Sequence, residues 1–519
     1  MKLIRFTIGK MAADKQFRSL YPGFEVVFRL PQEESPEALD AFNPFCLAGL
    51  NGTGTSNVLE ALAAIFFHLE CCVARFRPKS FKTFDPAQCH PCAFTLEYLI
   101  QRSGERQAIE NFDRVLITKE EGDPPRMQFK PFTDDTVDYE EISLKPYEEN
   151  GFPKAAPGKA YLPDIVIGYS SGENEILSIL FLKSRLINDD KYRQDYFSKY
   201  CYERPENSLI YIDEGMSQAV LLSCLMFEEQ GSTLQFLIRE LKLLDIVSFR
   251  MNINVQLMAN LPATNPETAP VTAHIASLLE EIKKSATCWF EDPRKEMTVL
   301  TLDFLVSKET RTAFRKLFRN SFDCFRFSQM LYELNACFLD ETMKREVYQS
   351  KGIYTQGKLP QPDPQQDIFH FLDFLILKEV RAGEPPKELL LKEFSDGEHQ
   401  FLHTMGMCLM LKEERTLLLL DEPETHFNPG WRSRFIQILD ESIDAGGGNN
   451  LQKEIVLTSH SPFILSDCRP EKVLIFEKDG QGKATVAKAW QKGWNTYGMS
   501  VNLLTARVFK QEKTIGEYA

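Results

Sequence analysis

A glycine-rich loop between an apolar strand and an apolar helix constrains the fold of this chain more than any other feature. Residues 45–48 read Phe-Cys-Leu-Ala, which is typical of a short buried strand, and the glycine-rich loop follows at residues 49–57. Beyond the loop, apolar residues recur at helical spacing from Val58 to Leu69. In this order of elements, backbone N–H groups and the N-terminal dipole of the helix can gather around one anion. The pattern therefore predicts an α/β fold that presents a phosphate site.

The loop residues suit a nucleotide that carries Mg²⁺, with one departure. Ser56 offers a hydroxyl to the metal, but Thr55 stands where the phosphate-loop pattern has a lysine. Without that lysine, the loop taken alone also fits a structural glycine turn. The candidate nucleotide-binding residues of the loop are Asn51, Gly52, Thr53, Gly54, Thr55, Ser56 and Asn57.

Two further apolar strands end in residues with matching chemistry. Asp421 closes a run of four leucines, which is how a strand presents an aspartate that positions Mg²⁺, so Ser56 and Asp421 are the predicted metal ligands. Glu422 follows directly and is placed to polarise an attacking water. The second strand leads to His460, which can sense the γ-phosphate. Glu422 and His460 are therefore the predicted catalytic residues.

A polar segment upstream of Asp421 supplies the fourth element. Residues 394–400 read Phe-Ser-Asp-Gly-Glu-His-Gln and lead into a helical stretch. Ser395 and Gly397 at the start of that helix can grip a γ-phosphate from the side opposite the loop, and Glu398 belongs to the same candidate set. Four elements in this order indicate a nucleotide site rather than a chance glycine turn.

Together these motifs resemble the ABC-type ATPases of the RecF, SMC and OLD group. In that comparison residues 394–400 correspond to the signature motif, and residues 421–429 correspond to Walker B plus the D-loop. The resemblance implies an ABC-type ATPase head, a mixed sheet with flanking helices, that uses ATP and Mg²⁺. In that group ATP lies between the phosphate loop of one head and the signature of another. A homodimer or a larger dimer-based oligomer is therefore implied.

A narrower resemblance concerns biological role. The glycine loop and residues 169–175 resemble the PtuA ATPases of Septu and retron-associated anti-phage systems. This resemblance implies an ATP-binding sensor that controls a separate HNH nuclease of the PtuB type. It also brings in a retron reverse transcriptase and its msDNA as candidate partners.

The chain divides into three regions by pattern. Residues 1–184 are predicted to form an ABC ATPase lobe with the phosphate loop, and residues 387–519 a second lobe with the signature, Walker B and the switch histidine. Residues 185–386 are predicted to be a mainly helical insertion that docks a partner. They contain long apolar stretches at 219–227 and 234–246 and no sustained heptads.

Composition narrows the function classes. The chain has 60 basic and 74 acidic residues, a net charge of −14, which argues against a surface that is basic all over and wraps nucleic acid. Its 12 cysteines are diluted over 519 residues without a signal peptide, so we expect reduced thiols and a cytoplasmic protein. No window approaches about 18 uninterrupted apolar residues, so no transmembrane helix is predicted.

Two functions from different classes remain open. The first is the sensor that regulates a separate nuclease, because too few residues follow His460 for the nuclease domain of an OLD protein and the histidines lack HNH spacing. The second is a RecF-like ATPase that binds DNA directly in repair. In both, Thr55 is expected to weaken ATP hydrolysis, and a nucleotide-locked scaffold without turnover is the limiting case.

Four weaker patterns have structural explanations beside the functional ones. Residues 209–214 resemble a second Walker B but also fit acids at a helix start, and residues 169–175 resemble a second signature or take the place of the Q-loop. Residues 89–92 read Cys-His-Pro-Cys and, with the cysteines at 71–72, fit a zinc site or a turn with buried thiols. The basic residues between 311 and 319 form a helix face that is either solvated or in contact with nucleic acid.

Overall fold

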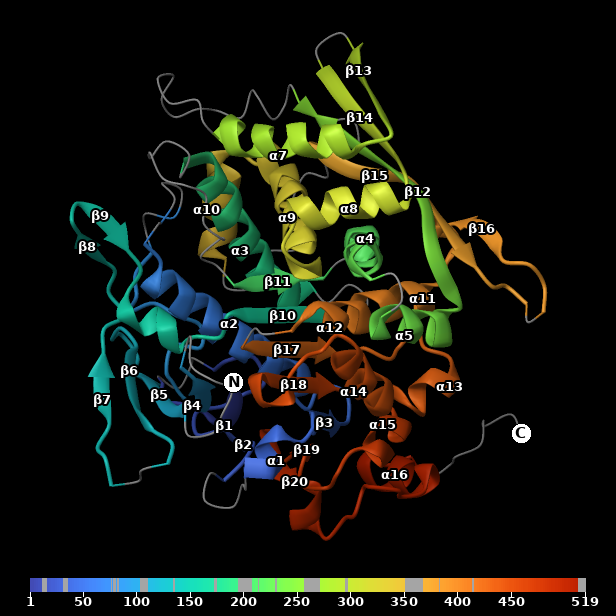
Figure 1. Ribbon diagram of the computed structural model, residues 1–519. Coiled ribbons are helices and arrows are strands. Elements are labelled where there is room, and N and C mark those ends of the chain that lie inside the picture. Colours follow the sequence, from blue (N-terminus) through green and yellow to red (C-terminus); the bar gives the residue numbers. More distant parts are fainter. Residues whose placement is uncertain are drawn as a thin grey trace.

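The computed structural model follows the chain through two layered lobes (Figure 1). The residues that it describes are 1–11, 16–30, 36–75, 77, 81, 84–102, 111–133, 136–171, 175–194, 208–212, 214–228, 231–255, 271–294, 297–350, 367–381, 383–412 and 415–511.

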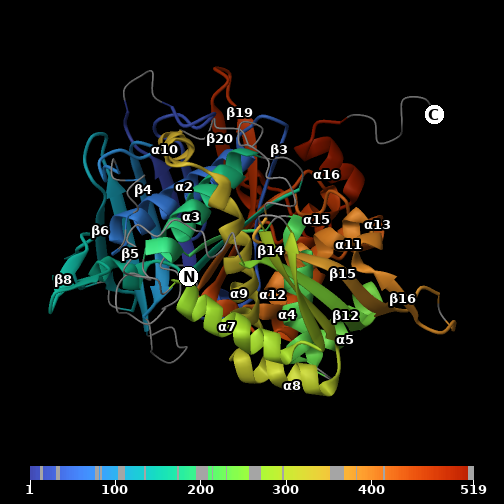
Figure 2. The same cartoon turned by 90° about the horizontal axis from the view of Figure 1, so that it is seen from above.

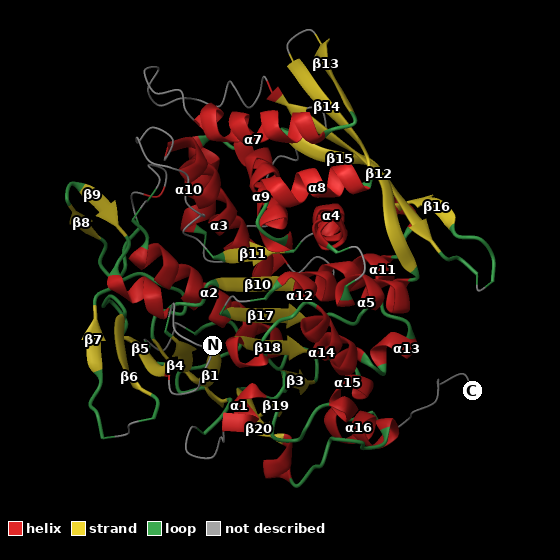
Figure 3. Cartoon of the chain, viewed as in Figure 1, coloured by secondary structure: helices red, strands yellow, loops and turns green. Residues whose placement is uncertain are grey.

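A seven-stranded sheet, here called the central sheet, lies in the middle of the molecule (Figures 1 and 3). Its order is β11-β10-β17-β18-β3-β19-β20, and all neighbours are parallel except β19 and β20. The strands are β3 (Phe45–Gly49), β10 (Ile165–Ser170), β11 (Leu209–Tyr211), β17 (Thr416–Asp421), β18 (Lys453–Thr458), β19 (Val473–Lys478) and β20 (Ala484–Lys488). Parallel strands covered on both faces have continuous apolar sequences, which is why three of them were recognisable from the sequence.

Alternate residues of the central strands face two different hydrophobic cores. In β17, Leu417 and Leu419 belong to one core, whereas Leu418 and Leu420 belong to the other. The first core holds α2 (Thr55–Val73) and α3 (Glu175–Gln194). The second holds α4 (Ser217–Phe227), α12 (Met407–Met410), α14 (Phe435–Ala445) and α15 (Pro462–Asp467). The fold is therefore a mixed sheet with flanking helices, as predicted.

A six-stranded antiparallel sheet packs on the α2 side, in the order β2-β1-β4-β5-β6-β7. Its strands are β1 (Lys2–Ile8), β2 (Glu25–Val27), β4 (Phe94–Gln101), β5 (Phe112–Lys119), β6 (Arg126–Pro131) and β7 (Glu140–Ile142). Arg29, just after β2, forms an ion pair with Glu454 on β18, and the two side chains are 3% and 2% exposed. This buried pair ties the antiparallel sheet to the central sheet.

The third sheet, here called the insertion sheet, is antiparallel with the order β13-β14-β12-β15-β16. Its strands are β12 (Leu243–Asn254), β13 (Cys288–Arg294), β14 (Met297–Leu305), β15 (Phe369–Lys378) and β16 (Lys387–Leu390). Helices α5 (Ser232–Leu241), α7 (Val271–Ser285), α8 (Lys308–Leu317), α9 (Ser321–Leu334) and α10 (Glu341–Gln349) accompany it. Seen from above, the insertion sheet lies on the side of the molecule away from the six-stranded sheet (Figure 2).

The structure corrects the predicted limits of the insertion. The boundary between residues 184 and 185 falls inside α3, and β11 belongs to the central sheet, because its backbone forms a parallel ladder with β10. At the other limit, β15 and β16 pair across residue 386. The stretch 234–246, read as helical, changes to strand after Leu241, because Lys242 takes a left-handed conformation that ends α5. Helices still outnumber strands in this region, but the sheet was not predicted.

The remaining short elements are β8 (Tyr147–Glu149), β9 (Phe152–Lys154), α1 (Pro36–Asp40), α11 (Asp396–Phe401), α13 (Pro429–Arg432) and α16 (Val501–Val508). Among the described helices, α2 alone is long and apolar enough to span a membrane, with a mean hydropathy of 1.4. It is 89% buried within the fold and carries Glu60 and Glu70, which pair with Arg18 and Lys159. These properties are those of a core helix.

Candidate functional site

The glycine loop after β3 has the backbone of a tight cradle. Gly54 adopts a φ of 105° and caps α2, which begins at Thr55. A Cβ on Gly54 would lie 2.5 Å from the Ser19 hydroxyl, and one on Gly49 would lie 2.6 Å from the Phe476 carbonyl oxygen. Larger residues are therefore excluded at both positions, and the amino end of α2 opens toward the loop.

Three elements distant in sequence meet at Asp421, the last residue of β17. The Ser56 hydroxyl donates to Oδ1 of Asp421 at 2.8 Å, and the Thr458 hydroxyl donates to the same oxygen at 2.7 Å. Ser170, at the end of β10, donates to Oδ2 at 3.3 Å. The structure thus brings together the two predicted metal ligands and adds two hydroxyls that the sequence did not single out. Both additions are polar residues that close apolar strands, which is the signal that could have revealed them.

The two predicted catalytic residues also lie side by side. Nε2 of His460 is 3.5 Å from Oε1 of Glu422, and both side chains are partly exposed. Glu422 has a φ of +48°, and its N–H donates to the Thr458 hydroxyl at 3.0 Å. This left-handed turn directs the glutamate away from the strand, and the contact with Thr458 connects it to the Asp421 cluster.

A third carboxyl group, that of Glu424, is buried near Glu422 and His460. Glu424 is 5% exposed and accepts a hydrogen bond from the Ser459 hydroxyl, next to His460. Its second oxygen, Oε2, has no hydrogen-bond partner among the described residues. Burial raises the pKa of Glu424 to about 7. Sequence reasoning missed this group, because a glutamate after Asp421-Glu422-Pro423 reads as one more surface acid.

Several predicted nucleotide-binding side chains of the loop are occupied within the protein. The Asn57 amide donates to the Ser19 hydroxyl at 2.7 Å, and the Thr53 hydroxyl donates to the Leu50 carbonyl oxygen at 2.7 Å. Thr55 is 7% exposed. These contacts hold the shape of the loop, so the groups that face outward are mainly the backbone and Asn51, which is exposed.

The signature segment is built as a helix start. Ser395 caps α11, and it forms reciprocal hydrogen bonds with Glu398, whose carboxylate also pairs with Lys378. A Cβ on Gly397 would lie 2.7 Å from the His426 carbonyl oxygen, so the helix touches the segment that follows Walker B. Within the described residues, no hydrogen bond connects Ser395, Gly397 or Glu398 with the glycine loop of the same chain. Glu398 serves the cap and the ion pair, and the Ser395 hydroxyl, although exposed, takes part in the same cap.

The signature helix continues into a π-helical segment, Leu402–Gly406, before α12. Here the Ser217 hydroxyl at the start of α4 bonds Nδ1 of His399 at 3.1 Å and Nε2 of His403 at 2.6 Å. Irregular helical turns of this kind occur frequently at functional sites. The contact joins the insertion region to the signature helix.

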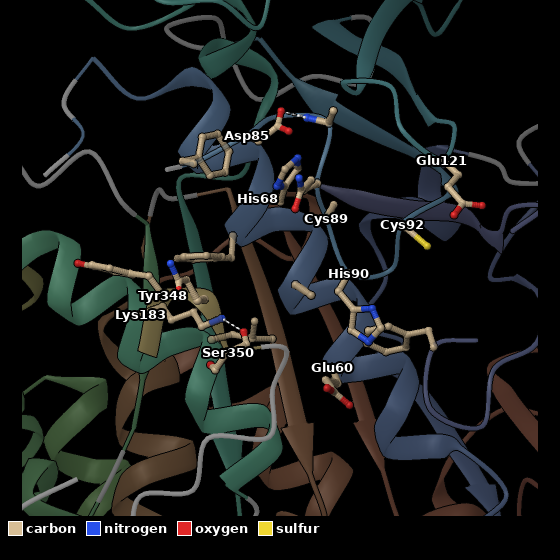
Figure 4. A pocket seen from close by; sticks show the side chains of 18 of the residues that line it. Glu60, His68, Asp85, Cys89, His90, Cys92, Glu121, Lys183, Tyr348 and Ser350 are labelled. Atoms are coloured by element: carbon tan, nitrogen blue, oxygen red, sulfur yellow. Dashed lines mark hydrogen bonds between the residues drawn. The ribbon is translucent and has the colours of Figure 1, made fainter. Parts of the chain in front are cut away.

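A cavity of about 1030 Å³ lies between α2, α3 and the end of α10 (Figure 4). Burial lowers the pKa of His68 to about 4 and that of Lys183 to about 8, and Lys183 bonds the Ser350 carbonyl oxygen. Cys89 and Cys92 line this cavity in a turn, with the Cys92 thiol 3.1 Å from the sulfur of Met11. The described part of the chain contains no cluster of three metal-ligating side chains, so the zinc interpretation has no support here.

The predicted basic face on α8 is not a continuous surface. Arg311 is buried and bonds both the Leu225 carbonyl oxygen and Asp245, while Nε of Arg315 donates to the Met226 carbonyl oxygen at 3.3 Å. The helical spacing was correct, but the first basic residues hold the helix against α4. The central part of the Q-loop candidate, residues 172–174, and Asp213 of the second Walker B candidate lie outside the described residues.

Comparison with known proteins agrees with this site. Residues 370–466, which include the signature helix, Asp421 and His460, match the family described as "AAA domain, putative AbiEii toxin, Type IV TA system". Over these residues the chain is similar to an AAA-type ATPase domain.

Two individual proteins are similar to parts or to the whole of the chain. The protein ea59 of Escherichia phage lambda is 27% identical over 128 residues, which is 25% of this chain, and the chain spans only 23% of that protein. The SMC head domain from Thermotoga maritima aligns over 94% of this chain and 99% of its own, with 9% identity and a TM-score of 0.32.

Proposed function

We propose that the chain is an ABC-type, ATP-binding regulatory ATPase of a cytoplasmic anti-phage defence system that controls a separate HNH nuclease. The observation that carries the ATPase part is the hydrogen-bonded cluster of Ser56, Asp421 and Thr458, with Glu422 and His460 beside it. The match to a family described as a putative toxin of a toxin–antitoxin system supports the defence role.

The donor set at Asp421 fits Mg²⁺. A carboxylate and the Ser56 hydroxyl are hard oxygen ligands, and they lie at the amino end of α2, where the N–H groups of the loop can donate hydrogen bonds to phosphate oxygens. When bound, Mg²⁺ supplies positive charge to the β- and γ-phosphates. Thr458 and Ser170 orient the Asp421 carboxylate through their hydroxyls.

Glu422 and His460 are proposed to act at the γ-phosphate end. The Glu422 carboxylate accepts a proton from an attacking water, and its left-handed backbone holds it beyond the strand end. His460 lies 3.5 Å from that carboxylate and can donate a hydrogen bond to the γ-phosphate. Thr55 leaves the loop without a lysine, so slow turnover is expected.

We further propose that two copies are needed for a complete site. Ser395 is exposed at the start of α11, where its hydroxyl bonds Glu398, and we propose that this exposed helix start meets the phosphate held by a second copy. The insertion is then the surface proposed for the nuclease, and in a retron setting for the reverse transcriptase with its msDNA.

A binding experiment tests the ATPase part of this proposal. Wild type and Asp421→Asn are titrated with ATP and Mg²⁺ by calorimetry, and we expect binding by wild type and a loss of about 10-fold or more in the variant. Glu148→Gln, on exposed β8, is the matched control. Light scattering at saturating ATP should show a dimer or larger assembly. Wild type that binds no ATP, or remains a monomer, contradicts the proposal.

The nuclease part has its own test. The chain is co-expressed with a small HNH nuclease of the PtuB type, and co-purification with ATP-dependent DNA cleavage is expected. The chain alone should cut neither DNA nor RNA with Mg²⁺ or Mn²⁺. Cleavage by the highly purified single chain would contradict the proposed division of labour.

A further inference from the structure

The glycine loop lacks its own lysine, but a lysine of a neighbouring strand lies beside it. β19 runs parallel to β3, with Phe476 opposite Gly49. Lys478 is the last residue of β19, and because parallel strands end at the same edge, its side chain begins next to the loop. A Cβ on Gly52 would lie 3.8 Å from Nζ of Lys478.

Among the described residues, Lys478 has no hydrogen-bond or ion-pair partner, whereas nearby Lys483 and Lys492 are engaged. Lys492 pairs with Glu477, and Lys483 lies over the ring of Tyr21 at 5.5 Å. The Asp479 carboxylate accepts the N–H groups of Gln481 and Lys483. Within the described part of the chain, no acceptor lies within hydrogen-bond or ion-pair distance of the exposed Lys478 ammonium group.

Arg18, a second described cation near the loop, is already engaged. Arg18 precedes Ser19, whose hydroxyl contacts the loop, but the Arg18 guanidinium forms a two-armed pair with Glu60 of α2. Its charge is therefore balanced inside the protein. Of these two described cations, Lys478 is the one whose charge is open to a ligand at Gly52.

We propose that Lys478 supplies to the nucleotide phosphates the positive charge that Thr55 does not supply. An ammonium group on a flexible four-carbon stem acts as a mobile point charge, and it reaches the loop from the strand side rather than from the helix. The pairing would strengthen ATP binding, because a phosphate oxygen accepts strongly from a charged donor. This inference rests on the proposed ATP site.

The test is a set of variants measured for ATP and Mg²⁺ binding by calorimetry. Lys478→Ala is expected to weaken binding by about 10-fold, whereas Lys478→Arg keeps most of it. Lys483→Ala, in the same hairpin, is the matched control and should change binding by less than about 3-fold. Circular dichroism and thermal unfolding verify that each variant is folded, which is expected because Lys478 is exposed.

A second background separates this contact from a general charge effect. Thr55→Lys restores a lysine to the loop, so adding Lys478→Ala to it should cost less than about 3-fold. The inference is overturned if Lys478→Ala binds as wild type does, if Lys483→Ala loses as much, or if the cost is the same in both backgrounds. Wild type that binds no ATP overturns the proposed function as well, so the two failures are distinguishable.

Discussion

The central sheet and the insertion sheet place charged side chains in opposite ways. In the central sheet, parallel strands are buried on both faces, so polar groups gather at the strand ends, where Asp421 meets Ser56 and Thr458. In the insertion sheet, antiparallel strands have one face partly open. There Arg250 bonds Asp303 across neighbouring strands, and the two side chains are 37% and 28% exposed.

The difference predicts where substitutions have large effects. A charge beneath or at the end of the central sheet is desolvated, so removing its partner leaves an unpaired group. A cross-strand pair on the open face of the insertion sheet exchanges its partner for water at little cost. Each of the following experiments tests that ranking.

The largest effect is expected for Arg29→Ala. This substitution leaves the buried Glu454 of β18, in the central sheet, without its ion-pair partner. We expect the free energy of unfolding in urea to fall by about 3–5 kcal/mol. Glu25→Ala, which removes one member of the exposed Arg5–Glu25 pair, is the control and should cost less than about 1 kcal/mol. Equal losses in the two variants would break the comparison.

Thr55→Lys tests the chemistry at the edge of the central sheet. The new ammonium group stabilises the charge that develops on the transferred phosphate, so ATP turnover should rise by about 10²-fold. Adding Asp421→Asn should abolish the gain, because the metal site is then lost. Steady-state phosphate release measures both variants. If wild type and Thr55→Lys hydrolyse ATP at equal rates, position 55 has been misread.

Glu424→Gln tests the buried acid by its pH dependence. The folded carboxyl has a pKa of about 7, above the ordinary value of 4.5, so the folded chain keeps a proton that the unfolded chain releases. The free energy of unfolding of wild type should therefore fall between about pH 4.5 and 7. Relative to the neutral Gln variant, wild type should lose about 2 kcal/mol between pH 5 and 8, measured by urea unfolding. Exposed Glu148→Gln should leave the wild-type pH profile unchanged.

The smallest effect is expected for Arg250→Ala on the insertion sheet. Since Arg250, Asp303 and Asp373 are all reached by water, the free energy of unfolding should fall by less than about 1 kcal/mol. Sodium chloride at 1 M should reduce even this difference. A loss comparable with that of Arg29→Ala would contradict the claim that charged pairs contribute more to stability in the central sheet than in the insertion sheet.

The same contrast explains what could be predicted from the sequence. The strands leading to Gly49, Asp421 and His460 are apolar runs that end in glycine or polar residues, and local pattern alone was enough to find them. That these residues form one site was predicted from the order of the motifs and from the resemblance to ABC-type ATPases. β12 was not predicted as a strand, because its first residues continue the apolar pattern of α5. Only the conformation of Lys242 separates the two elements.

Other parts of the site depend on contacts that no local pattern encodes. Buried Glu424 is bonded by Ser459, the residue after β18, and the position of Lys478 depends on the pairing of β19 with β3. Arg311 was read as part of a surface because its helical spacing is that of a basic face. Only the packing of α8 against α4 turns its guanidinium inward.

The edge strand β11 has a consequence for anyone who engineers this protein. Since β11 and half of α3 lie beyond residue 184, a shortened chain that lacks residues 185–386 would lose β11, the edge strand of the central sheet. Its β10 would then present bare N–H and C=O groups, a template for pairing with other chains. A trimmed version should instead keep residues up to β11 and α4 and rejoin the chain ahead of α11, so that the central sheet keeps its edge strand β11.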